Sequence, residues 1–198
     1  MYANHSATMS HMDTTHDGLA AVLEYWCTTL SAAERFGGGA AIDQAIRERF
    51  ADTHAAVAAG ECWKYRTNAR AALAEVIVLD QFSRHIFRGT ADAFAYDGQA
   101  LVLAQHMIAQ GFDRELSSAE RLFCYLPFMH SESGAIHADA LPLFESLGDA
   151  EALKYEHIHK DIIDRFGRYP HRNEVLGRQS TPEEETYLAH HHEDFFAV

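Results

Sequence analysis

The chain has 198 residues, a formal net charge of −13 and a hydrophobic fraction of 47%. This length favours a single domain with a substantial core, and the composition is ordinary for a soluble globular protein. The negative charge argues against broad binding to nucleic acid or to anionic membranes, and no stretch reaches the roughly 18 apolar residues of a membrane span. Cys27, Cys62 and Cys124 form no CxxC pair, which is typical of scattered thiols in a reducing compartment, so we predict a cytoplasmic protein.

Apolar residues recur at helical spacing along almost the whole chain, and the alternating β-branched runs of strands are missing. We therefore predict one all-α domain over 18–190 with seven or eight helices. In chain order they are expected at 18–30, 41–60, 68–89, 94–111, 117–126, 137–148, 149–167 and 180–188. Residues 1–17 are expected to be a disordered leader, and 191–198 a tail.

Several helix ends carry recognisable signals. Ser117 with Glu120, and Ser180 with Glu183, have the spacing of capping boxes. Asp149 is a plausible N-cap for the helix that follows it. Pro127 is expected to close the helix that starts after Ser117, because proline cannot continue the hydrogen-bond pattern inside a helix.

The helix predicted at 68–89 carries charge within its apolar surface. It is apolar nearly all round, which is typical of a buried helix. Asp80, Arg84 and Arg88 are nevertheless spaced i, i+4 and i+8 on one apolar stripe. Because an unpaired buried ion costs several kcal/mol, these side chains must find partners.

Two further polar segments are expected to meet this stripe. In the helix at 149–167, His159 lies in the middle of the apolar face, whereas His157 points away from it. The segment "RFGRYPHRNEVLGR" (165–178) then gathers four arginines, and "PFMHSES" (127–133) follows another helix. Guanidinium groups keep their charge and need anions, so we expect these segments to converge on one inward polar site.

The order of these motifs resembles a bacterial domain-of-unknown-function family, the one numbered 924. The resemblance covers roughly residues 20–188 and rests on "LEYW", "VIVLDQFSRHIFRGTADAFAYD", "ERLFCYLPFMHSES" and "HKDIIDRFGRYPHRNEVLGRQSTPEE". It implies stacked helix pairs in a tetratricopeptide-like α-α superhelix and brings no established activity. The motif positions are Asp80, Gln81, Phe82, Arg84, Arg88, Gly89, His130, Ser131, Glu132, His159, Arg165, Phe166, Gly167, Arg168, Pro170, His171, Arg172, Asn173, Gly177 and Arg178. Ser83, His85, Ser133 and Tyr169 depart from the family pattern, where Pro, Asn, an acidic residue and Phe are expected.

The arginine-rich segment admits two interpretations. Its arginines could pair with Asp80, Glu132, Asp161 or the acidic run at 183–185 and pin the last helix. Alternatively they could clamp a phosphate or carboxylate, as guanidinium forks do. Only Asp80 and Glu132 are identified as inward acids, so the arginines outnumber them, which favours an anion from outside.

We therefore predict an inward pocket that binds a small anion or an acidic peptide. In this hypothesis Asp80 orients Arg84, while His130, His159 and His171 donate hydrogen bonds. The residues expected to bind the anion or support it are Asp80, Arg84, Arg88, Arg165, Arg168, Arg172, Asn173 and Arg178.

Two alternatives stay open. A hydrolase could use His130, His159 and His171 with Glu132, with or without a metal. No HExxH, Walker A, GxGxxG or GxSxG motif supports a specific chemistry, and no cofactor or metal site is predicted. The third hypothesis is a partner-binding scaffold in which the motifs are purely structural. The sequence leaves the oligomeric state undetermined.

Overall fold

The computed structural model describes residues 17–190. Within this range the chain is helical and has no β-strand, which confirms the all-α prediction. Of the predicted leader, only Asp17 falls inside the described residues, and it is helical; the predicted tail at 191–198 lies outside them. The tetratricopeptide-like superhelical stacking stays a prediction.

The helices follow the expected order, with an additional short α-helix and two π-helical turns in the described part of the chain. The first helix, 17–23, continues into a π-helical turn at Glu24–Thr29, and a short α2 that the sequence did not predict follows it. A second π-helical turn, Val78–Phe82, lies between α4 and α5 in one continuous helical segment. The α-helices are α2 (Ala32–Gly37), α3 (Ala40–Ala58), α4 (Ala69–Ile77), α5 (Ser83–Ile86), α6 (Asp97–Ala109), α7 (Ser118–Met129), α8 (Gly134–Leu147), α9 (Ala150–Phe166) and α10 (Pro182–His190).

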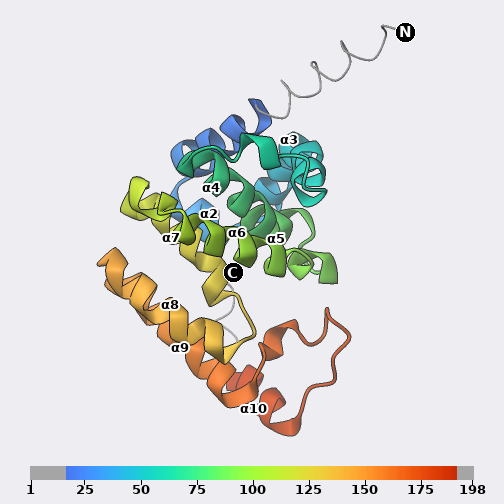
Figure 1. Ribbon diagram of the computed structural model, residues 1–198. Helices are drawn as coiled ribbons and strands as arrows, with labels where there is room; N and C mark the ends of the chain where they lie inside the picture. The colour runs from blue at the N-terminus through green and yellow to red at the C-terminus, as the bar shows by residue number, and fades with distance from the viewer. Residues whose placement is uncertain (1–16, 191–198) are drawn as a thin grey trace, which may run out of the picture.

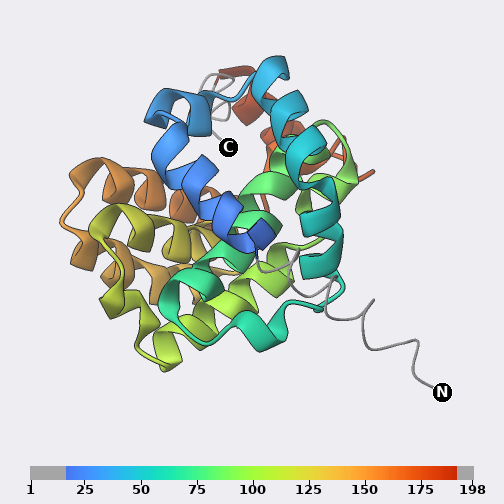
Figure 2. The ribbon, with the colours of Figure 1, turned by 90° about the horizontal axis from the view of Figure 1, so that it is seen from above.

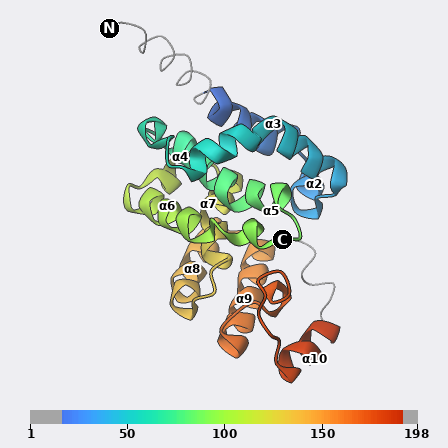
Figure 3. The ribbon, with the colours of Figure 1, turned by 90° about the vertical axis from the view of Figure 1, so that its right-hand side faces the viewer.

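The helices form two groups in space (Figures 1 and 3). The first helix and α2–α7 make the larger group, in which α3 packs on α5 and α4 packs on α6. The first helix lies beside α3 when the molecule is seen from above (Figure 2). The second group is the packed pair α8 and α9 with α10 at its outer end. The junction between α7 and α8 therefore lies where the two groups meet.

Aromatic side chains from both π-helical turns form the centre of the main core. Trp26 is fully buried, and its ring meets those of Phe82, Phe123 and His85 edge-on at centroid distances of 5.5–5.8 Å. Such edge-to-face contacts are favourable beyond simple burial. The core thus fixes the segment containing Val78–Phe82 against the first helix and α7.

Two predicted helix ends differ from the structure. Pro127 lies inside α7, which continues to Met129. A proline this near the end of a helix removes one backbone hydrogen bond. The two residues that follow it in α7, Phe128 and Met129, are buried. The last capping interaction is shifted by one residue, because Glu184 N donates to Thr181 Oγ1 and Thr181 N donates to Glu184. The predicted pair Ser180 and Glu183 is therefore wrong.

A second, smaller core attaches the arginine-rich segment and α10 to α9. Ile162, Ile163 and Tyr169 are buried together, and Phe166 and Tyr187 pack against them. Tyr169 also donates a hydrogen bond to the carbonyl of Met129 at the end of α7. This contact fixes the segment after α9 at the junction between the two helix groups.

The predicted capping box at the start of α7 is confirmed, because the Ser117 side chain accepts from Glu120 N and the Glu120 side chain accepts from Ser117 N. Ser117→Ala removes one acceptor and is expected to lower the free energy of unfolding by about 1 kcal/mol. Ser118→Ala, at the exposed neighbouring position, should change it by much less. Urea denaturation of both variants makes the comparison, and equal losses would contradict the assignment.

Candidate functional site

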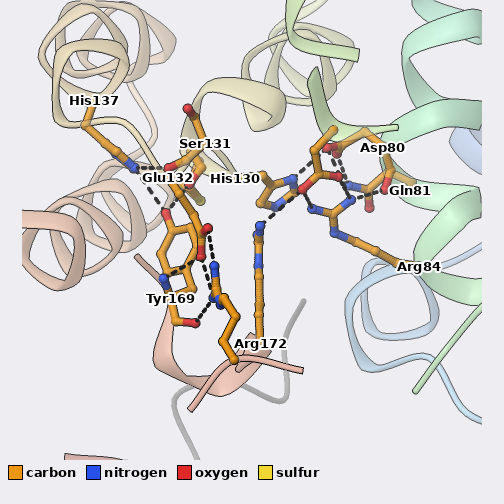
Figure 4. A network of polar contacts seen from close by, with 12 residues as sticks. Asp80, Gln81, Arg84, His130, Ser131, Glu132, His137, Tyr169 and Arg172 are labelled. Atoms are coloured by element: carbon orange, nitrogen blue, oxygen red, sulfur yellow. Dashed lines mark hydrogen bonds and ion pairs between the residues drawn. The ribbon is translucent and has the colours of Figure 1, made fainter. Parts of the chain in front are cut away.

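The buried carboxylate of Asp80 lies at the centre of the polar site. Asp80 belongs to the π-helical turn Val78–Phe82 and has 0% exposure. π-helical turns are frequent at functional sites because the extra residue re-aims side chains. Gln81 donates to Asp80 Oδ2 at 2.6 Å, and His130, the C-cap of α7, places its Nδ1 at 2.7 Å from Asp80 Oδ1 (Figure 4). Arg84 Nη1 lies 3.5 Å from the same Oδ1 and donates to the Asp80 carbonyl at 2.5 Å.

The protonation states of Asp80 and His130 follow from these contacts. Burial alone would raise the pKa of Asp80, but His130, Arg84 and the hydrogen bond from Gln81 lower it below its usual range. Burial lowers the pKa of His130, and the attraction of Asp80 does not fully offset this. The pair is therefore a carboxylate that accepts from the Nδ1–H of a neutral imidazole.

Asp97 joins Arg84 to the arginine-rich segment. As the first residue of α6, it accepts from Arg84 through both oxygens, at 2.9 and 3.0 Å, and from Arg172 Nη1 at 3.2 Å. Both guanidinium groups lie near the ring of Phe94. Burial lowers the pKa of Arg172, and the repulsion of Arg84 lowers it further. Together they outweigh the attraction of Asp97, which raises it. Arg172 is thus held by fewer favourable contacts than Arg84.

The other arginines of the segment pair with carboxylates of the protein. Arg165 meets Glu183 at the surface, and Arg168 holds Glu184 with two hydrogen bonds at 2.7 and 2.8 Å. Arg178 forms two further bonds to Glu132, at 2.6 and 2.9 Å.

Asn173 completes this network of side chains. It donates to Ser180 and Glu184, and it accepts from Arg178 Nε. In this part of the chain the contacts match the ion-pair interpretation of the segment.

The sequence-based count of inward acids was too low. It included Asp80 and Glu132 but not Asp97, Glu184 or Asp43, which pairs with Arg88 at 2.6 and 2.9 Å. Asp43 lies on the apolar face of α3 with Ile46. A single acid on an apolar helix face is the sequence pattern that could have identified it as an inward acid. Asp97 carries no comparable pattern.

Sequence reasoning also missed a buried pair beside the site. His137 Nε2 lies 2.9 Å from the carbonyl of Ser131, which can only accept, so this nitrogen carries a proton. His137 Nδ1 lies 2.7 Å from Glu156 Oε1, and both side chains are fully buried. Burial raises the pKa of Glu156, although the hydrogen bond with His137 lowers it in part. The Tyr169 hydroxyl lies 3.1 Å from His137 Nε2. Together with the His137–Glu156 pair it stabilises the junction between α7 and α8.

A cleft of about 530 Å³ opens beside this network. Of the predicted site residues, Arg84, Arg88, His130 and His159 line it. Asp80, which contacts His130, is not part of the cleft wall. Neither Glu132 nor the predicted residues from the segment after α9 are part of its wall; these are Arg165, Arg168, His171, Arg172, Asn173 and Arg178. The cleft wall also contains Arg35, Gln81 and His85, which the sequence did not identify as site residues.

One wall of the cleft is apolar and another is cationic. The apolar wall comes from α2 and α7 and consists of Phe36, Leu122, Phe123, Leu126 and Met129. Arg35 donates from Nη1 to the carbonyls of Trp26 and Leu30, and no carboxylate between residues 17 and 190 pairs with it. Arg35 Nη2 makes no hydrogen bond within that range and is not sealed in the core. Its charge is therefore available to a ligand.

Two histidines of the cleft, His130 and His159, direct a donating Nδ1 at acceptors of the protein. His159 points inward as expected, and its Nδ1 lies 2.8 Å from the carbonyl of Tyr155. Burial lowers the pKa of His159 to about 3, so the ring is neutral. Because Nδ1 donates in both His159 and His130, the remaining Nε2 of each ring carries a lone pair.

Neither a metal centre nor a membrane span is found in the described part of the chain. Residues 17–190 contain no group of three or more His, Cys, Asp or Glu side chains arranged to hold a metal ion. None of the helices they form is long and apolar enough to cross a membrane.

Comparison with known proteins gives a family and a related structure. The model of the bacterial protein family of unknown function DUF924 matches residues 22–192. A protein of unknown function from Agrobacterium tumefaciens is similar in structure, with a TM-score of 0.84 and 38% sequence identity. The similarity covers 89% of this chain and 99% of that one. Comparison with curated proteins gives no match.

The contacts of Asp97 predict different costs for removing its two arginines. Arg84→Met leaves Asp80 and Asp97 without their main cation and is expected to cost about 3–5 kcal/mol of unfolding free energy. Arg172→Met should cost clearly less, because Asp97 keeps both bonds to Arg84 and the charge of Arg172 is itself disfavoured. Chemical denaturation of the two variants decides this. A larger loss for Arg172→Met would show that the charge balance is assigned incorrectly.

Proposed function

Since the chain belongs to the bacterial family DUF924, whose function is unknown, we propose a function from its own cleft: it binds a small organic acid. The observation that carries the proposal is Arg35, a cation in the cleft wall with no carboxylate partner between residues 17 and 190. Arg84 and Arg88 also line the cleft, but Asp80, Asp97 and Asp43 already neutralise them. A carboxylate beside Arg35 gives this guanidinium group the ionic partner that it lacks within that range.

The apolar wall indicates the rest of the ligand. Phe36, Phe123 and Leu126 cover a surface that an alkyl or aryl group can contact, and a volume near 530 Å³ is typical of small-molecule sites. Phosphate alone would leave this wall uncovered. The predicted acidic peptide is less favoured, because Asp149 and Glu151 also line the cleft and would repel a second negative charge.

A chain-length series tests this proposal. Each methylene buried on the apolar wall contributes about 0.8 kcal/mol, so affinity should rise by roughly tenfold for every two carbons from acetate to butyrate to hexanoate. Hexanoate should raise the melting temperature of the parent protein, and much less so in Arg35→Met. Arg165→Met removes an exposed arginine whose partner is Glu183, outside the cleft, and is the matched control.

Arg35 also supports the end of the first helix, so the readout is the ligand-induced change in melting temperature rather than the melting temperature itself. Arg35→Lys keeps the charge and should retain part of the response. If neither hexanoate nor inorganic phosphate stabilises the parent protein at millimolar concentration, the cleft does not bind anions.

A second candidate function is hydrolysis with His130 as the general base. The observation in its favour is the Asp80–His130 pair, in which an ionised carboxylate holds Nδ1–H and leaves Nε2 as a proton acceptor. Glu132, which the sequence grouped with the histidines, is occupied by Arg178 and by the backbone of Tyr169. Turnover of hexanoate esters that is lost in His130→Asn would support this candidate over simple binding.

A further inference from the structure

Two imidazole rings in the cleft share an unusual arrangement. His130 comes from the end of α7 and His159 from the middle of α9, and they are only 2% and 6% exposed. Each ring has its Nδ1 fixed by an acceptor of the protein, the Asp80 carboxylate at 2.7 Å and the Tyr155 carbonyl at 2.8 Å. Both side chains line the cleft. Their orientation is therefore set by the protein before any ligand enters.

The other nitrogen of each ring is unpartnered. Neither Nε2 makes a hydrogen bond to any residue of the range 17–190, and neither is sealed in the core. Both rings are neutral, so each Nε2 presents a lone pair to the cleft. A ligand that covers these atoms without offering a hydrogen leaves buried acceptors unsatisfied, which weakens binding.

The group that satisfies them must be a neutral donor. Burial is the largest cause that lowers the pKa of each ring, and the nearby guanidinium groups lower it further: Arg84 acts on His130, and Arg172 on His159. The same burial and the same cations disfavour an ammonium group of a ligand at this place. A hydroxyl group donates a hydrogen bond without bringing charge.

We propose that the natural ligand of the cleft is a hydroxy acid, whose hydroxyl group donates to Nε2 of His130 or His159 while its carboxylate meets Arg35. This inference rests on the proposed function and adds the ligand class. It also explains why the site combines a cation with two acceptors: the cation selects the acid, and the acceptors select its hydroxyl group.

The test compares hexanoate with 2-, 3- and 6-hydroxyhexanoate by isothermal titration calorimetry on the full chain at pH 7.5. At least one hydroxy acid should bind about tenfold more tightly than hexanoate, the value of one hydrogen bond to a buried acceptor. The three isomers are needed because the hydroxyl position sets its distance from the carboxylate. This comparison uses the parent protein and does not depend on the folding of any variant.

Two variants locate the acceptor. Asparagine can place its amide nitrogen near the position of Nδ1, so His130→Asn and His159→Asn keep the donor to Asp80 or Tyr155 and remove Nε2. In one of them the preference for the hydroxy acid should fall to near unity. His157→Asn, on the exposed face of the same helix as His159, is the matched control and should keep the preference.

Three results would overturn the proposal. Equal affinity for hexanoate and all three hydroxy acids removes the hydroxyl preference but leaves acid binding intact. Uptake of a proton when hexanoate binds, detected by repeating the titration in buffers of different ionisation enthalpy, means that an imidazole acts as a cationic donor. If none of the acids binds, the proposed function fails and this inference fails with it.

Discussion

The buried carboxylate of Asp80 is the constraint on which the rest of the site depends. A charge at 0% exposure in the middle of a hydrophobic helix is stable only when hydrogen-bond donors and a cation surround it. The chain supplies them from Gln81 and Arg84 on the same helical segment and from His130 at the end of α7. Satisfying one carboxylate therefore fixes α7 against the segment that contains the π-helical turn.

The need to balance buried charge also links Asp80 to the segment after α9, through Arg84. This guanidinium charge is shared between Asp80 and Asp97, and Asp97 in turn holds Arg172 of the segment after α9. The ion pairs at 165–178 and the His137–Glu156 pair then hold that segment and the junction between α7 and α8 in place. Each pair is nearly neutral as a unit, so the network leaves little net charge in the core. Arg35, with no carboxylate partner among residues 17–190, is the exception at the edge of the cleft.

The sequence predicts the local parts of this arrangement well. The helical phase placed Asp80, Arg84 and His159 inward and His157 outward, and the spacing of Ser117 and Glu120 predicted the start of α7. These inferences depend on residues a few positions apart, where helix geometry decides the contacts. The polar segments that were expected to converge are brought together by Asp97, which lies 75 residues from Arg172. No local sequence pattern identifies such a partner. When Asp97 and the other distant acids are counted, the arginines no longer outnumber the inward acids.

The hydrogen-bonding roles of the histidines could not be read from the sequence either. They depend on which ring nitrogen meets an acceptor of the protein: in His130 and His159 it is Nδ1, which leaves Nε2 of each ring with a lone pair. For the same reason, the ligand inferred from the structure is a hydroxylated acid rather than a bare anion. The arginines of 165–178 therefore have a structural role. The candidate ligand site is the cleft beside α2, α5, α7 and α9 instead.

The central claim is that His130 and His159 are neutral rings protonated at Nδ1. Long-range ¹H–¹⁵N correlation spectra of the protein labelled with ¹⁵N-histidine, with His130→Asn and His159→Asn used for assignment, measure this directly. Both rings are expected to have an unprotonated Nε2 at pH 7.5, because burial holds both pKa values below the usual value near 6.5. His159, whose pKa burial lowers to about 3, should keep it down to pH 5. A ring that is protonated at Nε2 at pH 7.5, or a His159 ring that becomes cationic above pH 5, would contradict this.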